Sequence, residues 1–478
     1  MHKTRVITST LGYPQKNRTE SEGYEGVQTY MDMKDGSLIA VQPNKDDLMS
    51  RILSPDNLNR AYLQVVRNKG VGGVDKMDCK QLLPYLRQHK AELIESIRIG
   101  KYKPNPVRRV EIPKDNGKKR LLGIPTVVDR LIQQSIAQVL SPIYERQFSP
   151  SSFGFRPNRS AHGALLQVCR YASEGYKYAV GIDLARFFDT VNHSFLLRIL
   201  SRTIKDGRVI SLIHKYLTSG VMIGKHYEPS MEGTPQGGPL SPLLSNIMLN
   251  ELDKELERRG HRFVRYADDS MILCKSKRSA ERVCASITEF VEKELHLTVN
   301  REKTEIGYIR GMKYLGHSFY FTKGKCRLCV HKKTKDKFKR KVKSLTGRSN
   351  GISYAQRKEV LWQTFRGWLE YFKYADMKTM LKPLDQWYRR RLRMCIWKCW
   401  KRVGSRFANL QKCGIPKSKA WEWANTRKGY WRCTRAFLQN AIMDESLRRA
   451  GYPMLSHLYE QMHIDCETAV CGTACTVV

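Results

Sequence analysis

The stretch that decides the fold is Phe263-Val264-Arg265-Tyr266-Ala267-Asp268-Asp269-Ser270-Met271-Ile272-Leu273. Apolar residues flank two adjacent carboxylates, a pattern that predicts a hairpin of two strands within residues 262–275. Carboxylates at the tip of such a hairpin are held by a rigid sheet. Because aspartate is also common in ordinary turns, the pair Asp268-Asp269 by itself fits a purely structural turn at least as well.

A second carboxylate follows a short apolar run at residues 178–182, which we expect to be a buried strand. Asp183 ends this strand, and a carboxylate at the end of a central strand needs compensation, usually by a cation. If the two strands are neighbours, Asp183 and Asp268 face each other. Two Mg²⁺ ions about 3.5–4 Å apart could then lie between them, an arrangement suited to in-line phosphoryl transfer.

The remaining pattern predicts an α+β fold with a small mixed sheet. Residues 48–140 are largely helical in pattern, interrupted by a basic hairpin at 108–122. Further helices are expected at 193–202, 240–260 and 280–296. From about residue 332 the composition becomes basic and rich in aromatics, so we expect a domain boundary near residue 325.

The charge of the chain indicates a polyanionic partner. Its 478 residues carry 85 Lys and Arg against 45 Asp and Glu, a formal charge of +40. Such an excess is typical of proteins that bind nucleic acid, although a ribosome-associated or merely very soluble protein remains an alternative. A membrane partner is not expected, because the sequence has no long apolar run and no lipidation pattern.

The 13 cysteines show no regular pairing, which favours free thiols in a reducing cytoplasm. Cys326, Cys329 and His331 come closest to a zinc pattern, but a second cysteine pair at a suitable distance is missing. Cys395 and Cys399 are helically spaced and are expected to pack one helix face.

Several segments together resemble the reverse transcriptases encoded by group II introns. Tyr266-Ala-Asp-Asp269 and Asp183-x-x-x-Phe-Phe-Asp-Thr-Val-Asn-His193 are similar to the two metal-binding blocks of that family's palm. Four further blocks occur in the family's order, across residues ~48–320: Ser152–Ser160, Gly233–Pro242, Leu297–Thr304 and Lys313–His317. The resemblance implies a right-hand polymerase with fingers and palm, followed by an α-helical thumb and maturase region.

The resemblance assigns roles by position. Asp183, Asp268 and Asp269 match the carboxylates that hold two Mg²⁺, for which Mn²⁺ can substitute, and Lys303 matches a lysine that protonates the leaving pyrophosphate. Phe188 matches the gate that excludes a 2′-hydroxyl, although a plain core role is the alternative. The other matched residues are the triphosphate-holding Lys114 and Arg120, the loop residues Gln236 and Gly237, and the primer-gripping Tyr314, Leu315 and Gly316.

The segment 326–463 interleaves cations with aromatics. Between Trp387 and Lys401 helical spacing separates an apolar face from a face of Arg and Lys, which predicts RNA binding, although an ordinary amphipathic helix would look similar. The expected RNA-binding residues are Arg389, Arg390, Arg391, Arg393 and Lys398.

The implied organisation is a flexible extension at 1–45, fingers and palm at 46–325, thumb and maturase at 326–463 and a tail at 464–478. The tail carries only Cys466, Cys471 and Cys475 and no endonuclease motif, so we expect the compact bacterial subgroup without that domain. Implied partners are intron and template RNA, a DNA primer or target, and deoxynucleoside triphosphates, in a cytoplasmic or nucleoid-associated ribonucleoprotein. The sequence leaves open a monomer or a homodimer.

Two other functions are compatible with this resemblance. One is a splicing factor that keeps the fold without polymerising; the retention of Asp183, Asp268 and Asp269 argues against it. The other is a domesticated relative in host defence, against which the maturase-like region argues.

Overall fold

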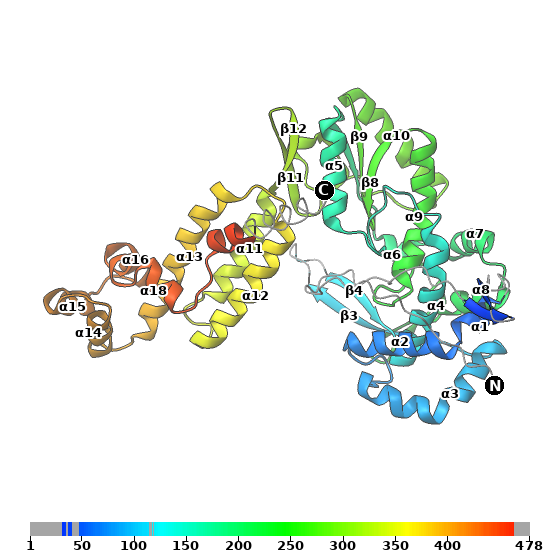
Figure 1. Cartoon of the computed structure of the whole chain (residues 1–478), viewed down its shortest axis with the longest axis horizontal. Helices are drawn as coiled ribbons and strands as arrows, with labels where there is room; N and C mark the ends of the chain where they lie inside the picture. Colours follow the sequence, from blue (N-terminus) through cyan, green and yellow to red (C-terminus); the bar gives the residue numbers. More distant parts are fainter. Residues whose placement is uncertain (1–30, 35–36, 41–46, 114–116, 118, 463–478) are drawn as a thin grey trace. The chain divides into compact units, whose positions relative to one another are not determined.

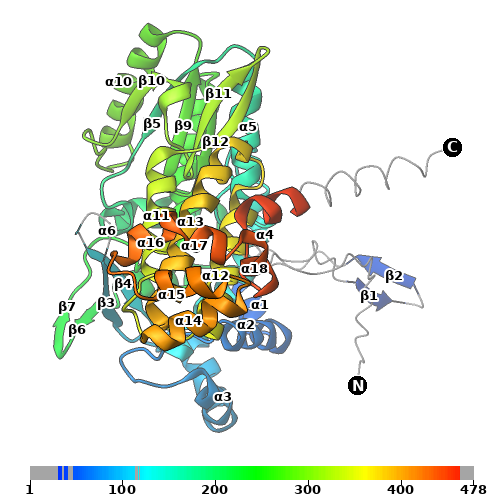
Figure 2. The ribbon, with the colours of Figure 1, turned by 90° about the vertical axis from the view of Figure 1, so that its left-hand side faces the viewer.

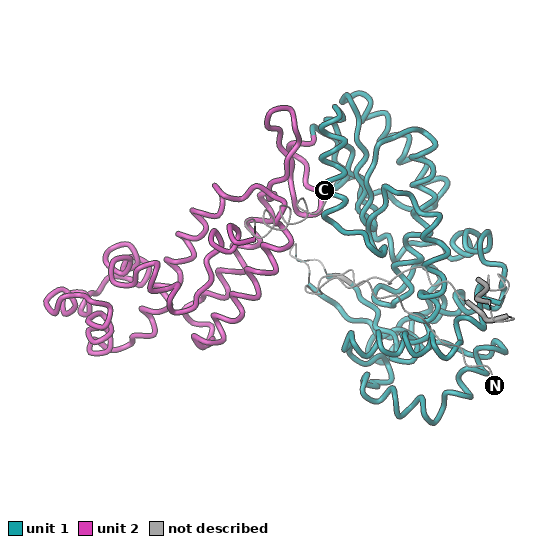
Figure 3. Tube along the Cα trace, in the orientation of Figure 1, with its two compact units in different colours: residues 1–308 teal, residues 309–478 magenta. Residues whose placement is uncertain are grey.

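The computed structural model describes residues 31–34, 37–40, 47–113, 117 and 119–462. The chain divides into two compact units, residues 1–308 and 309–478 (Figure 3). The expected tail lies outside the described residues, as does most of the expected extension, of which the strands β1 (Met31–Lys34) and β2 (Ser37–Ala40) are described. The functional boundary near residue 325 stays a prediction, because a compact unit need not be a functional domain.

Unit 1 is built around a four-stranded sheet in the order β10-β5-β9-β8 (Figures 1 and 2). Its strands are β5 (Tyr178–Ile182), β8 (Arg262–Tyr266), β9 (Asp269–Cys274) and β10 (Glu305–Tyr308). All three pairings are antiparallel, so the expectation of a mixed sheet is wrong here. The reason is that β9 turns straight back along β8, that β5 runs opposite to β9, and that β10 runs opposite to β5.

The predicted strands and helices of this unit are confirmed. Val180 and Ile272 are fully buried, as expected of central strands. The helices at 193–202, 240–260 and 280–296 are α7 (His193–Thr203), α9 (Ser241–Arg258) and α10 (Lys277–Lys293). The helices α10 and α5 (Ala161–Ser173) lie against the sheet.

A second sheet, in the order β4-β3-β6-β7, contains the predicted basic hairpin. The hairpin is β3 (Val107–Pro113) with β4 (Lys119–Ile124); β6 (Val221–Ile223) joins β3 in parallel and pairs with β7 (His226–Glu228). This sheet therefore combines parallel and antiparallel pairs, whereas we had expected a mixed sheet from residues 178–320. Helices supply the rest of the unit: α1 (Leu48–Ile52), α2 (Pro55–Arg67), η1 (Cys79–Gln81), α3 (Leu82–Arg98), α4 (Val127–Glu145), α6 (Phe187–Thr190) and α8 (Gly207–Leu217).

Unit 2 begins with η2 (Ile309–Gly311) and the hairpin of β11 (His317–Thr322) and β12 (Lys325–Val330), and is otherwise helical. Aromatic rings hold its helices together: Phe365 lies 5.7 Å from Phe338 and 4.9 Å from Tyr388, centroid to centroid. Its helices are α11 (Lys332–Leu345), α12 (Tyr354–Phe372), α13 (Lys378–Cys399), α14 (Val403–Lys412), α15 (Lys417–Ala424), α16 (Tyr430–Ala436), α17 (Leu438–Ala441) and α18 (Asp444–Arg449).

Among the described residues, no helix combines the length and the apolar composition needed to cross a lipid bilayer. In unit 2, Cys395 is buried on α13 whereas Cys399 is exposed, so only the first of this pair packs as expected.

Candidate active site

The turn between β8 and β9 carries the two adjacent carboxylates. Tyr266 pairs with Asp269, so Ala267 and Asp268 form the connection between the strands. Ala267 has φ +55°, a left-handed conformation that L-residues other than glycine, Asn and Asp rarely adopt. Asp268 and Asp269 are exposed while Ala267 beneath them is 5% exposed. The turn therefore presents both carboxylates outward from a buried and strained base.

Asp183 lies at the same end of the sheet. In the antiparallel pairing of β5 with β9, Ile182 lies opposite Ser270, so the next residues along, Asp183 and Asp269, continue this register. The segment after α10 fixes the backbone of Asp183, whose carbonyl accepts from the Asn300 amide at 2.8 Å. From the same segment, Lys303 Nζ lies 3.1 Å from Asp183 Oδ2.

These carboxylates fit a divalent cation in chemical type and in position along the strands. Hard cations such as Mg²⁺ prefer carboxylate oxygens, and Asp183 already faces the positive charge of Lys303. Across the described ranges, however, no three His, Cys, Asp or Glu side chains converge tightly enough to hold an ion as placed. The three carboxylates therefore suit a divalent cation as ligands, whereas their side chains, as oriented, do not converge on one position.

A buried ion pair supports the turn from below. Arg265 and Asp253 are 1% and 0% exposed, and Arg265 Nε donates to Asp253 Oδ1 at 2.7 Å. The Nη1 group of the same arginine donates at 3.0 Å both to the side-chain oxygen of Asn246 and to the carbonyl of Ala267. One guanidinium thus joins helix α9 to the strained residue of the turn.

The segment before α5 lies directly on the hairpin. The Phe153 amide donates to the Arg265 carbonyl at 2.8 Å, and the Arg265 amide donates to the Ser151 carbonyl at 2.9 Å. At Gly154 the approach is so close that a Cβ atom would lie 2.1 Å from the amide nitrogen of Ala267. Only glycine allows this contact, which explains why glycine occurs within the block Ser152–Ser160.

Sequence reasoning missed the supporting residues on α9. Asn246, Asn250 and Asp253 are all at most 5% exposed and occur at helical spacing in a run that is otherwise mostly apolar. Asn246 donates to the Gly154 carbonyl at 2.8 Å, and Asn250 donates to the Gln147 carbonyl at 3.2 Å. These polar residues occur at positions i, i+4 and i+7, which share one helix face, and this spacing could have predicted that they support the site.

The structure brings Phe188 and the loop of Gln236 and Gly237 together. The Thr234 amide donates to the Phe188 carbonyl at 2.6 Å, and the Gly123 amide of β4 donates to the Gln236 carbonyl at 2.7 Å. Phe188 is only partly buried, with its ring 5.2 Å from that of Phe187, which is 2% exposed. This contrast agrees with Phe187 as the core residue of the pair.

His193 anchors the start of that loop. Its Nε2 lies 2.6 Å from the Gly233 carbonyl oxygen. Burial lowers the pKa of His193, so the ring is neutral near pH 7, and Nε2 must carry the proton because a carbonyl only accepts.

Of the two predicted triphosphate cations, Lys114 lies outside the described residues. Arg120 is in β4 opposite Ile112, and its side chain also lies outside what the structure describes. The predicted primer-gripping residues belong to unit 2. There, Leu315 and Gly316 both have positive φ, and the Leu315 carbonyl accepts from the Tyr371 hydroxyl at 3.1 Å.

The four arginines expected on an RNA-facing surface of α13, here the α13 arginines, instead make contacts inside unit 2. They are Arg389, Arg390, Arg391 and Arg393. Arg393 is 5% exposed, and both it and Arg389 form ion pairs with Asp444. Arg390 lies 4.0 Å above the Trp431 ring, and Arg391 donates to Thr346 Oγ1 at 2.6 Å.

These guanidinium groups thus have carboxylates, carbonyls and rings of neighbouring helices as partners, and their expected role in binding RNA stays a prediction. Lys398 is half-buried, with its ammonium 5.6 Å from the Tyr430 ring centroid. Its expected role in binding RNA stays a prediction.

Exposed cations occur after α14 instead. Lys417, Lys419, Arg427 and Lys428, here the terminal cations, are all exposed. Within the described part of the chain, no ion pair involves any of them. Trp421, on the same helix as the first two, is 59% exposed, and its ring lies edge-on to Phe407 at 5.7 Å. This surface offers four exposed cations and an exposed ring, with one acidic residue, Glu422, on the same helix.

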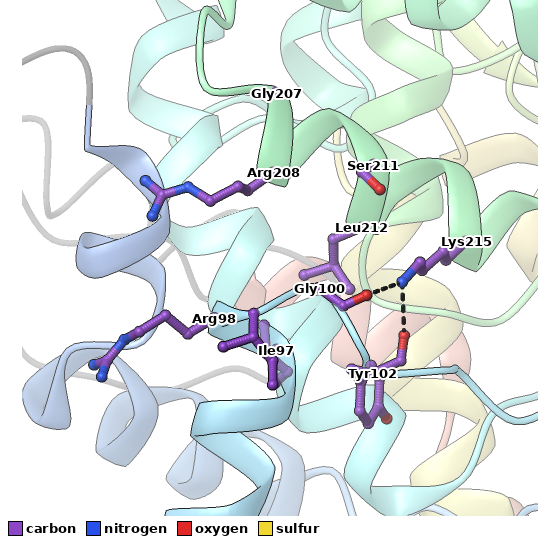
Figure 4. A pocket seen from close by; sticks show the side chains of 10 residues that line it. Ile97, Arg98, Gly100, Tyr102, Gly207, Arg208, Ser211, Leu212 and Lys215 are labelled. Carbon is purple, nitrogen blue, oxygen red and sulfur yellow. Dashed lines mark hydrogen bonds between the residues drawn. The ribbon is translucent and has the colours of Figure 1, made fainter.

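A cavity of about 360 Å³ lies elsewhere in unit 1, between the end of α3 and the helix α8 (Figure 4). Its cations are already used by the protein: Lys215 donates to the carbonyls of Gly100 and Tyr102, and Arg208 pairs with Asp206 and Asp47. It contains none of the carboxylates of the candidate site, so we assign it no role in catalysis.

Two protein families match this chain. The family described as "Reverse transcriptase (RNA-dependent DNA polymerase)" matches residues 112–319, and "Group II intron, maturase-specific domain" matches residues 335–414. The chain is 33% identical over 311 residues to Protein YkfC of Escherichia coli (strain K12), covering 56% of this chain and 82% of that protein.

Two further relatives carry descriptive names. Group II intron-encoded protein LtrA of Lactococcus lactis subsp. cremoris is 40% identical over 218 residues, 45% of this chain and 36% of LtrA. Nuclear intron maturase 2, mitochondrial, of Arabidopsis thaliana is 30% identical over 237 residues, 41% of this chain and 31% of that protein. The matches to these two intron proteins therefore span about a third of their length.

Proposed function

Since the chain belongs to the group II intron reverse transcriptases, a family of RNA-directed DNA polymerases that also assist intron splicing, we propose that unit 1 copies RNA into DNA at Asp183, Asp268 and Asp269. The observation that carries the proposal is the antiparallel register of β5 on β9, which brings these carboxylates to one end of one sheet.

The family depends on divalent metal, and we propose two Mg²⁺ ions held by Asp183 and Asp268, with Asp269 contributing less. Bound there, the ions would stabilise charge on the attacking and leaving oxygens. Of the chain's own groups, Lys303 would give a proton to the departing pyrophosphate, and its contact with Asp183 supports this role. The ring of Phe188 would lie against the sugar and disfavour a 2′-hydroxyl.

The binding partners follow from the same assignment. We propose that the protein uses an RNA template, a DNA primer and deoxynucleoside triphosphates, and that it binds the intron RNA that encodes it. The charge of +40 supports a polyanionic partner. Because the α13 arginines are occupied within unit 2, we assign phosphate contacts to the exposed terminal cations rather than to α13.

The test is primer extension on an RNA template with and without Mg²⁺, comparing the parent protein with Asp268→Asn. The amide keeps the size of the side chain and loses the charge that attracts the ion. We expect extension to fall by more than about 100-fold while RNA affinity changes little. Extension within about tenfold of the parent would reject the metal assignment, and a parent protein that binds RNA without extending would identify a splicing factor that does not polymerise.

A further inference from the structure

We propose that Arg265, Asp253 and Asn246 form a brace that fixes the turn of Asp268 and Asp269, and so sets how tightly the site holds its metal ions. These are positioning residues, since none of them would touch substrate or metal. The inference rests on the proposed function, because it concerns the same carboxylates.

The strained turn needs an external support. Ala267 occupies the left-handed region at φ +55°, which costs an alanine about 1–2 kcal/mol compared with its ordinary conformations. Its carbonyl accepts from Arg265 Nη1 at 3.0 Å. An unsupported two-residue connection could relax to a less strained turn, and the carboxylate of the next residue, Asp268, would then point elsewhere.

The brace is too polar to be explained by stability alone. Arg265 and Asp253 are 1% and 0% exposed, and buried ion pairs contribute little net stability because desolvation offsets their attraction. The pair instead fixes the orientation of the Arg265 guanidinium. A guanidinium is a rigid planar fork, so the bonds of Nε and Nη2 to Asp253 dictate where Nη1 points.

Asn246 completes the brace and links it to a second segment. Its side-chain oxygen accepts from Arg265 Nη1 at 3.0 Å, and its amide group donates to the Gly154 carbonyl at 2.8 Å. Gly154 in turn lies against the backbone of Ala267. Both the guanidinium and the chain at Gly154 therefore contact the turn at Ala267, and Asn246 couples the two.

The first test is Arg265→Lys, which keeps the buried charge opposite Asp253 but cannot make all the bonds of the fork. Mn²⁺ binding to the full chain would be followed by electron paramagnetic resonance, counting only the fraction that Asp268→Asn abolishes. We expect that binding to weaken about 10–100-fold, the usual effect of losing a residue that orients metal ligands, and the Mg²⁺ concentration for half-maximal extension to rise in parallel. Arg357→Lys is the matched control: Arg357 is likewise buried, at 5% exposed, and donates to the Leu345 carbonyl and Asn350 in unit 2, so metal binding should not change.

The second variant, Ala267→Gly, separates positioning from folding. Glycine adopts φ +55° without strain, so the turn then needs less support. The melting temperature and the Mn²⁺ affinity of Ala267→Gly should stay near those of the parent or rise, and adding Ala267→Gly to Arg265→Lys should restore part of the lost Mn²⁺ affinity. Unchanged Mn²⁺ affinity in Arg265→Lys, or a double variant that binds Mn²⁺ no better than Arg265→Lys, would overturn the brace. If Asp268→Asn itself keeps full Mn²⁺ binding and extension, the proposed function fails instead, so the two failures are distinguishable.

Discussion

Replacing Gly154 by alanine tests whether the close packing on the catalytic turn matters for activity. The new Cβ would lie 2.1 Å from the amide nitrogen and 2.9 Å from the Cα of Ala267. Non-bonded carbon atoms prefer separations of about 3.5–4.0 Å, so one of the two backbone segments must retreat by roughly 1 Å or more. Neither atom belongs to a flexible side chain that could turn away.

The expected magnitude follows from what this retreat breaks. Two hydrogen bonds of 2.8 Å hold the Gly154 segment: the Phe153 amide donates to the Arg265 carbonyl of the hairpin, and Asn246 of α9 donates to the Gly154 carbonyl. At about 1 kcal/mol each, with about 1–3 kcal/mol for overpacking, the free energy of unfolding should fall by about 3–5 kcal/mol. If the turn moves instead, a displacement of about 1 Å should lower the rate of nucleotide addition about 10²-fold.

The assay is single-nucleotide addition to a primer on an RNA template, with thermal unfolding measured in parallel. Gly207→Ala is the control: it is the first residue of α8, where an added Cβ would meet nothing within 4 Å, and alanine favours helix. Its activity should equal that of the parent. Nucleotide addition by Gly154→Ala within about threefold of the parent, with unchanged thermal stability, would refute the inferred contact.

Phe188→Ala should admit ribonucleotides, because removing a half-buried ring opens space beside the 2′-hydroxyl; an unchanged ratio of dNTP to rNTP incorporation would place the gate elsewhere. Changing the terminal cations to Gln should flatten the salt dependence of RNA affinity by about 0.7–0.9 in log–log slope per lost contact, with little change in melting temperature. The same change in the α13 arginines should lower the melting temperature of unit 2 instead. The opposite pattern would indicate that the α13 arginines bind RNA. Burial lowers the pKa of His193 below the value near 6.5 in the unfolded chain, so the unfolded state takes up the proton first, and stability should be lost as pH falls below about 6.5. His193→Gln, which can still donate to Gly233, should lose less stability between about pH 7.5 and pH 5, measured by urea unfolding. Equal losses in the two proteins would contradict the role of His193.

The sequence by itself determined the secondary structure around the site. Apolar strands flank Asp268 and Asp269 without interruption, and local patterns of this kind specify a hairpin through short-range interactions alone. The apolar run before Asp183 likewise predicted a buried strand. The hairpin of β3 and β4 and the helices α7, α9 and α10 were also predictable, because their periodicity and turn residues lie within short windows of sequence.

Only the tertiary structure decided which partners these side chains have. The residues of α13 show cations on a helical pattern, but whether a guanidinium faces solvent or Asp444 depends on where a helix some 50 residues later packs. The sheet around β5 proved antiparallel throughout for a similar reason, since strand direction is set by long-range pairing. The support of the catalytic turn was hidden in the same way: Arg265, Asp253 and Gly154 come from a strand, a helix and a loop. A polar residue in an apolar helix indicates that a hydrogen-bonding partner exists, but only the fold determines which residue that partner is.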